Sequence, residues 1–170
     1  TAIMLTALGA SVLLKSSGGS RLVQLKDFYT GKGEKPNQLM PSEILAEIRV
    51  PLLPAGSGSA YVRHADRAAI DFASLSVGIS VTVEPKTNVC RHIAISVGGV
   101  GPKPFIAGEA ADILTGKELT DDLVDEACLL TAKGAKPVTH MAVPAHHKRR
   151  IIPVYVKRAL KKALDLAHSA

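Results

Sequence analysis

A short charged stretch, residues 61–73, offers the most chemistry in this sequence. Within it, Arg63, Arg67 and Asp71 recur at intervals of four residues. In one interpretation they form an ion-pair cluster with a purely structural role. In the other, an arginine meets an anionic or electron-rich cofactor, because the guanidinium group stays charged and offers planar hydrogen-bond donors. The spacing is compatible with both interpretations.

Two glycine-rich stretches could bind phosphate through backbone amides, but each fits a turn better. Residues 96–101 lead through Pro102 and Pro104 rather than into a helix, and they lack the dinucleotide-binding fingerprint. Residues 16–20 join two strand-like segments, which is typical of a hairpin. We therefore predict a turn at both places.

Histidine and cysteine are the remaining candidates for metal or cluster chemistry. His140, His146 and His147 have no cysteine or carboxylate near them in the sequence, and their spacing fits no standard site. Cys90 and Cys128 lie far apart and are too few for an iron–sulfur cluster, which takes about four thiolates. We predict no metal site here, and two buried thiols in a cytoplasmic protein.

Composition and charge exclude further classes of protein. Hydrophobic residues make up 46% of the 170 residues, as in packed proteins, and no apolar run reaches the ~20 residues of a membrane span. The net charge of +6 suggests nucleic-acid binding, but the basic segment 146–162 contains only Tyr155 as a base-stacking residue. We therefore expect no nucleic-acid partner, and a basic helix that faces solvent or another protein.

The N-terminal part is rich in predicted β-structure. It opens at Thr1 without an initiator methionine, so we expect that sequence preceded it. Residues 11–15 and 21–25 are typical of a hairpin, and residues 44–50 of a further strand. Residues 51–58 are rich in proline and glycine and nearly uncharged, which predicts a linker.

The second part combines strands with helices. Apolar runs predict an antiparallel meander over residues 60–64, 72–83 and 89–97. Helices are predicted over residues 107–114 and, after an N-cap at Thr120, to about residue 132. The pattern therefore predicts an α+β fold, with a three-stranded antiparallel sheet whose helices pack on one face.

A last, basic helix is predicted to end near residue 167. Pro153 either begins this helix, where its missing N–H costs nothing, or kinks it. One apolar stripe should face the core. Its members are Ile152, Val156, Ala159, Ala163 and Leu166.

Several segments follow one another in an order that resembles a known family. They are residues 5–28, the run Leu-Met-Pro-Ser-Glu-Ile-Leu-Ala-Glu-Ile-Arg-Val-Pro at 39–51, the cluster at 61–71, Val-Gly-Gly-Val at 97–100, Ile-Leu-Thr-Gly-Lys at 113–117 and the segment 147–160. Together they resemble the flavoprotein (FAD-binding, medium) subunit of the molybdenum hydroxylases, as in the carbon monoxide dehydrogenase medium subunit and the xanthine dehydrogenase FAD domain. The resemblance covers essentially the whole chain.

The resemblance implies a division into two domains. Residues 1–56 correspond to the C-terminal part of the FAD-binding domain, the tail of its second subdomain. Residues 57–170 correspond to the C-terminal domain of the carbon monoxide dehydrogenase flavoprotein, a three-stranded antiparallel sheet packed on a small helical bundle. The family's FAD-phosphate loops precede the segment that matches Thr1. The resemblance therefore implies FAD shared with an N-terminal portion.

The resemblance also assigns two flavin contacts. Leu45 is expected to pack near the isoalloxazine ring, and Arg63 to lie near its polar edge, where family members usually have lysine. Arg67 matches a basic position on the side of the iron–sulfur subunit. No residue of this chain is expected to be catalytic, and His147-Lys148 replaces the family's frequent Tyr-Arg.

The implied function is electron transfer within a cytoplasmic oxidoreductase. Electrons from a substrate oxidised at molybdenum cross iron–sulfur clusters to FAD and pass to an acceptor such as NAD. Molybdopterin and the iron–sulfur clusters belong to partner subunits. The alternative is a non-catalytic scaffold or docking module of the same complex, which does not bind flavin by itself.

Overall fold

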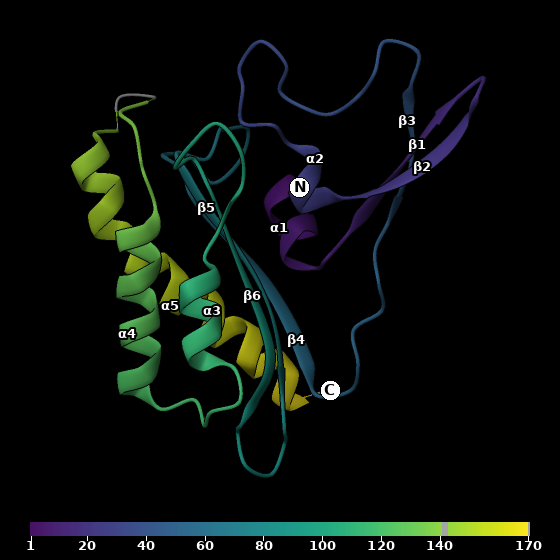
Figure 1. Ribbon diagram of the computed structural model, residues 1–170. Coiled ribbons are helices and arrows are strands. Elements are labelled where there is room, and N and C mark those ends of the chain that lie inside the picture. The colour runs from purple at the N-terminus through teal and green to yellow at the C-terminus, as the bar shows by residue number, and fades with distance from the viewer. Residues whose placement is uncertain (141–142, 170) are drawn as a thin grey trace.

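Two antiparallel sheets and their helices build the protein, as shown by a computed structural model that describes residues 1–140 and 143–169 (Figure 1). The elements follow in the order α1 (Ala2–Ala7), β1 (Ser11–Ser16), β2 (Gly19–Gln24), α2 (Leu25–Phe28), β3 (Ile44–Arg49), β4 (Ser57–His64), β5 (Leu75–Val83), β6 (Cys90–Gly98), β7 (Phe105–Ile106), α3 (Gly108–Leu114), α4 (Asp121–Gly134) and α5 (Ala145–Ser169).

The first sheet has the strand order β2-β1-β3. β1 and β2 form the predicted hairpin, closed where Ser16 pairs with Gly19, and the predicted strand at residues 44–50 is β3. Val12 and Leu14 of β1 are fully buried in a small core with Leu25 and Phe28. Apolar side chains on alternate positions of β1 therefore hold α2 against one face of this sheet.

The second sheet has the strand order β4-β5-β6-β7 and contains the predicted meander. The fourth strand, β7, was not predicted, because two residues carry no periodicity. β4 begins at Ser57, inside the predicted linker, and β5 begins at Leu75 rather than at residue 72. Residues 65–74 instead form the loop between β4 and β5.

The second sheet is covered on both faces. Val77, Ile79 and Val81 of β5 belong to the main core with α3, α4 and α5. On the alternate positions, a Cβ at Gly78 would lie 3.0 Å from the carbonyl oxygen of Ile3, and Ser80 Oγ donates to the carbonyl of Ala7 at 2.6 Å. The expectation of helices on one face is thus correct for α3–α5 but misses α1, which lies on the other face (Figure 1).

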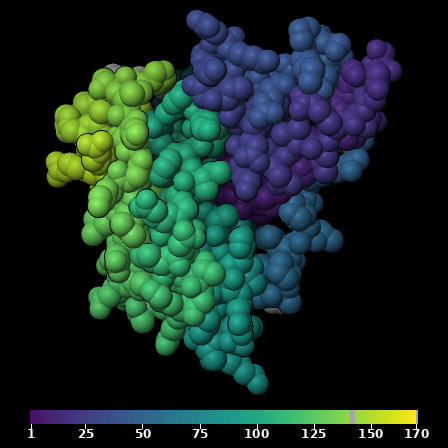
Figure 2. Space-filling model, viewed as in Figure 1, coloured from purple at the N-terminus to yellow at the C-terminus, as the bar shows by residue number. Residues whose placement is uncertain are grey.

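The first part of the chain packs directly on the second through α1. Figure 2 shows the N-terminal residues in contact with the strands that follow the linker. Because α1 packs on β5 and β6, the sheet of the second part depends on a helix of the first. The division at residue 56 stays a prediction.

Helix α5 begins at Ala145, so Pro153 lies inside it and does not start it. Four predicted core positions of α5 are fully buried, namely Ile152, Val156, Ala159 and Ala163. Leu166 was predicted wrongly, since it is 53% exposed, whereas Ala167 is buried. Four residues after Ala163, position 167 returns to the buried face of the helix, and Leu166 turns away from it.

Helix α4 begins as the sequence predicts. The Thr120 hydroxyl accepts a hydrogen bond from the backbone N–H of Leu123 at 3.4 Å, and Asp121 and Asp122 occupy the first turn. The cap satisfies one of the free amide groups at the start of the helix, and the acidic side chains lie at the positive end of its dipole.

Candidate functional site

Arg63 organises the loop between β4 and β5. It lies near the end of β4, where its guanidinium donates to the backbone carbonyls of Asp71, at 2.8 Å, and Ala68, at 2.5 Å. These two bonds tie the end of β4 to the loop between β4 and β5. Arg63 therefore positions backbone atoms in addition to carrying a charge.

Arg67 and Asp71 stabilise the same loop from within. The Asp71 carboxylate accepts a hydrogen bond from the Arg67 backbone N–H at 2.9 Å, and the guanidinium of Arg67 lies 3.8 Å from it. The backbone N–H of Arg67 is the main cause of the lowered pKa of Asp71. Arg63 bonds to the carbonyl of Asp71 and not to its carboxylate, so the predicted cluster exists but is held mainly through backbone groups.

A basic groove of about 560 Å³ runs beside Arg63, between β4 and α5. Its lining consists of Tyr61, Val62, Arg63, Tyr155, Arg158, Lys161, Lys162 and Asp165. The Arg158 guanidinium carbon lies 5.3 Å from the centre of the Tyr155 ring. Four cationic side chains and one carboxylate give the groove a positive potential. The basic residues of α5 thus line the same groove as Arg63, although they lie about a hundred residues away in the sequence.

Leu45 lies on β3, at the edge of the first sheet. It pairs with the fully buried Leu14, so its side chain is on the core face of the sheet, yet it is 40% exposed. All six residues of β3 are exposed. The Leu45 side chain is accessible and presents apolar surface.

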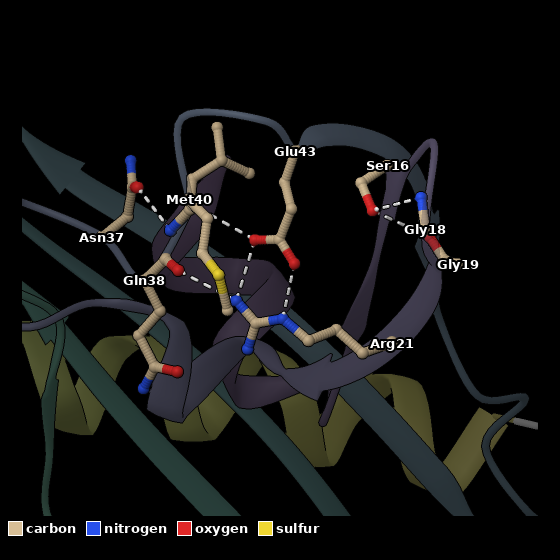
Figure 3. Close-up of polar contacts among 9 residues, drawn as sticks. Ser16, Gly18, Gly19, Arg21, Asn37, Gln38, Met40 and Glu43 are labelled. Carbon is tan, nitrogen blue, oxygen red and sulfur yellow. Dashed lines mark hydrogen bonds and ion pairs between the residues drawn. The ribbon is translucent and has the colours of Figure 1, made fainter.

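An ion pair between Arg21 and Glu43, which the sequence did not reveal, fixes the start of β3. Arg21 Nε donates to Glu43 Oε1 at 2.7 Å, and a terminal guanidinium nitrogen of Arg21 donates to Oε2 at 2.9 Å. The backbone N–H of Met40 also donates to this carboxylate (Figure 3). The Arg21 hydrogen bonds and the Met40 N–H lower the pKa of Glu43 to about 2. Since Glu43 directly precedes β3, this bidentate pair positions Leu45.

Replacing Glu43 with glutamine is expected to remove part of the acid sensitivity of the fold. The folded-state pKa lies below the ordinary value of 4.5, so the stabilisation is fully present above about pH 4.5 and is lost as the pH falls towards 2. Urea unfolding at about pH 6 and about pH 3 measures the difference. Glu34→Gln, at an exposed position, is the matched control; an equal loss of stability at low pH in wild type and Glu43→Gln would contradict the assignment.

The two predicted flavin contacts lie on different sheets. β3 packs along β1, whereas β4 packs along β5 and α5. The fold therefore does not bring Leu45 and Arg63 into one continuous sheet. They are two separate features of the surface, one apolar and one cationic.

The glycine-rich stretches are turns, as predicted. Residues 16–19 close the β1–β2 hairpin. Gly99 follows β6 with a φ of 80°, and a Cβ there would lie 2.4 Å from the carbonyl oxygen of Ser74. The Lys148 ammonium group donates to the carbonyl of Gly99 at 3.1 Å. Lys148 is only 1% exposed, and burial lowers its pKa. This member of the basic run is therefore buried, whereas the sequence predicted a helix face turned to solvent or to another protein.

The remaining candidates give no further site within the described residues. In residues 1–140 and 143–169 there is no group of three or more His, Cys, Asp or Glu arranged to hold a metal ion. Cys90 and Cys128 are free and buried, and burial raises the pKa of both thiols to about 11. None of the helices in these ranges is long and apolar enough to cross a membrane.

Both parts of the chain match known families. The family "CO dehydrogenase flavoprotein C-terminal domain" matches residues 60–163, and the family "FAD binding domain in molybdopterin dehydrogenase" matches residues 1–53. The glyceraldehyde dehydrogenase medium chain of Sulfolobus acidocaldarius is 32% identical over 94% of this chain and 55% of its own length. The carbon monoxide dehydrogenase medium chain of Afipia carboxidovorans is 28% identical over 94% of this chain and 54% of its own.

Solved structures agree with these matches. Carbon monoxide dehydrogenase from Hydrogenophaga pseudoflava superposes with a TM-score of 0.88 at 27% identity, covering 96% of this chain and 55% of that one. The chain thus spans about half the length of the relatives it matches. The resemblance and the α+β fold drawn from the sequence are confirmed. The chain belongs to the CO dehydrogenase flavoprotein C-terminal domain family, and its first 53 residues match the FAD-binding domain of molybdopterin dehydrogenases.

Proposed function

We propose that this chain is a portion of the FAD subunit of a molybdenum–iron–sulfur–flavin oxidoreductase. The subunit passes electrons from iron–sulfur clusters through FAD to an acceptor such as NAD. The observation that carries the proposal is the match of the two parts, in one order, to an FAD-binding domain and to a flavoprotein C-terminal domain. Its partners would be an N-terminal FAD-binding portion, an iron–sulfur subunit and a molybdenum subunit, in the cytoplasm.

The side chains of the candidate site suit an isoalloxazine ring. Leu45 offers accessible apolar surface for the ring face, while Tyr61, which is 40% exposed, and Arg63 offer an aromatic surface and a fixed positive charge. Bound FAD supplies the redox chemistry, and the protein positions it and tunes its electronics. The role of this chain is to hold an apolar wall through Arg21 and Glu43 and a cationic wall through Arg63.

The positive potential of the groove supports a role in electron transfer. Arg63, Arg158, Lys161 and Lys162 place four cations beside one carboxylate. Positive charge near a redox centre favours its electron-rich form, and the effect is larger where water is excluded. We propose that Arg63 is the nearest of these charges to the ring.

The 170-residue chain alone is expected to bind FAD weakly or not at all. The apolar and cationic walls proposed above contact only the isoalloxazine ring of FAD. By family resemblance, the loops that bind the FAD phosphates precede the segment matching Thr1. A titration that follows flavin fluorescence should show no stoichiometric quenching with the chain alone. Tight stoichiometric binding would contradict this expectation.

Co-expression with the N-terminal FAD-binding portion separates the proposal from the scaffold alternative. Protein that acquires the yellow flavin absorbance supports the flavin role. Colourless protein that still captures the iron–sulfur and molybdenum subunits would favour a non-catalytic docking module.

A further inference from the structure

A hollow of about 900 Å³ has neither Leu45 nor Arg63 in its lining. Three segments far apart in the sequence build it: α2, the stretch from the end of β6 through β7, and the segment after α4. Its lining is Lys26, Val100, Gly101, Pro102, Lys103, Pro104, Phe105, Ile106, Gly134, Lys136 and Val138. The end of α4 and the loop after β6 lie at the same upper end of the molecule (Figure 1).

The walls of this hollow are apolar. The Phe105 ring lies against α4 at Gly134, where an added Cβ would be only 3.0 Å from the ring. Ile106 and Val138 remain 42% and 59% exposed, so apolar surface faces the opening. The volume is in the range of small-molecule sites, about 300–1,000 Å³.

Three lysines, Lys26, Lys103 and Lys136, surround this apolar surface, and no acidic residue lines it. None of the three forms an ion pair with a carboxylate of the described residues. The stem of Lys103 lies against the loop at Gly31, where a Cβ would be 3.5 Å from Lys103 Cδ, so this lysine bridges the two parts of the chain. Three uncompensated positive charges around one opening favour an anion there.

We infer that this hollow binds a small amphipathic carboxylate, whose apolar body packs on Phe105, Ile106 and Val138 and whose carboxylate meets the lysines. Apolar contact supplies affinity, and the lysines supply the preference for negative charge. The site would join α2 to the segment after α4, so a ligand there stabilises the contact between the two parts of the chain.

Octanoate, compared with 1-octanol, tests both features of the site in the 170-residue chain. Calorimetric titration should show octanoate binding about tenfold more tightly than the alcohol. Methyl NMR signals of Ile106 and Val138 should shift with octanoate, while those of Ile48, on the exposed strand β3, should stay in place. Equal affinity for octanoate and octanol, or shifts centred on Ile48, would overturn the inference.

Charge-reversal variants identify the lysines. Lys103→Glu combined with Lys136→Glu should weaken octanoate binding about tenfold or more, with octanol binding unchanged. Lys86→Glu, on the β5–β6 turn and outside the hollow, makes one such charge change elsewhere and should leave binding as in wild type. If Lys86→Glu lost as much octanoate affinity as the double variant, the effect would depend on net charge alone, and the site would be refuted.

Discussion

Replacing Gly58 with alanine is expected to destabilise the fold by about 3 kcal/mol or more. A Cβ at this position of β4 would lie 1.9 Å from the carbonyl oxygen of Ala163 and 2.6 Å from the backbone nitrogen of Ala167. Both atoms are backbone, so the clash is relieved only if β4 and α5 move apart. That movement separates α5 from the rest of the main core.

Urea unfolding followed by circular dichroism measures this loss, and Gly33→Ala is the matched control. No heavy atom lies within 4 Å of a Cβ added at Gly33, so the same methyl group should change stability by less than about 0.5 kcal/mol. If the two variants unfold at the same urea concentration, the close approach of β4 and α5 is wrong. Because the basic groove lies between these two elements, Gly58→Ala should also perturb it.

Replacing Arg63 with alanine is expected to slow flavin reduction in the assembled complex by about tenfold to a hundredfold. The substitution removes a positive charge from the groove and frees the carbonyls of Ala68 and Asp71. The main core is untouched, so the free energy of unfolding should change little. Rapid-mixing measurement of flavin absorbance, with a thermal melt of each variant, checks both statements.

Arg63→Lys separates the charge from the loop contacts. Lysine, the residue usual in the family at this position, keeps the charge but loses the planar pair of donors. If charge dominates, Arg63→Lys should reduce flavin within a few-fold of wild type. Rates in Arg63→Ala equal to those of wild type would remove Arg63 from the flavin site and leave the loop role alone.

Local patterns predicted most of the secondary structure. The β1–β2 hairpin, the meander and the capped start of α4 follow from apolar periodicity and turn residues, which act over a few neighbours. Predictions failed where packing between distant segments decides. β5 begins at Leu75, after a loop that is bonded to Arg63 of β4, and Leu166 is exposed because the buried face of α5 returns at Ala167.

Most contacts of the candidate site could not be predicted from the sequence. Arg21 and Glu43 are separated by 22 positions, and only the folded loop brings them together. Tyr155 and Arg158 of the C-terminal helix line the groove between β4 and α5 together with Arg63. Leu45 was found through family resemblance, whereas Arg63 was a candidate from the charged stretch before the resemblance gave it a flavin contact; both roles towards flavin stay predictions.

The amino-acid sequence by itself determined most of the elements, the α+β class and the family, because these depend on short-range periodicity and on ordered motifs along the chain. Only the tertiary structure decided that α1 covers the second face of the sheet, that a basic groove forms beside Arg63, and that three lysines surround an apolar hollow. The physical reason is that each of these features joins segments distant in the sequence. Their side chains meet only after both sheets have packed.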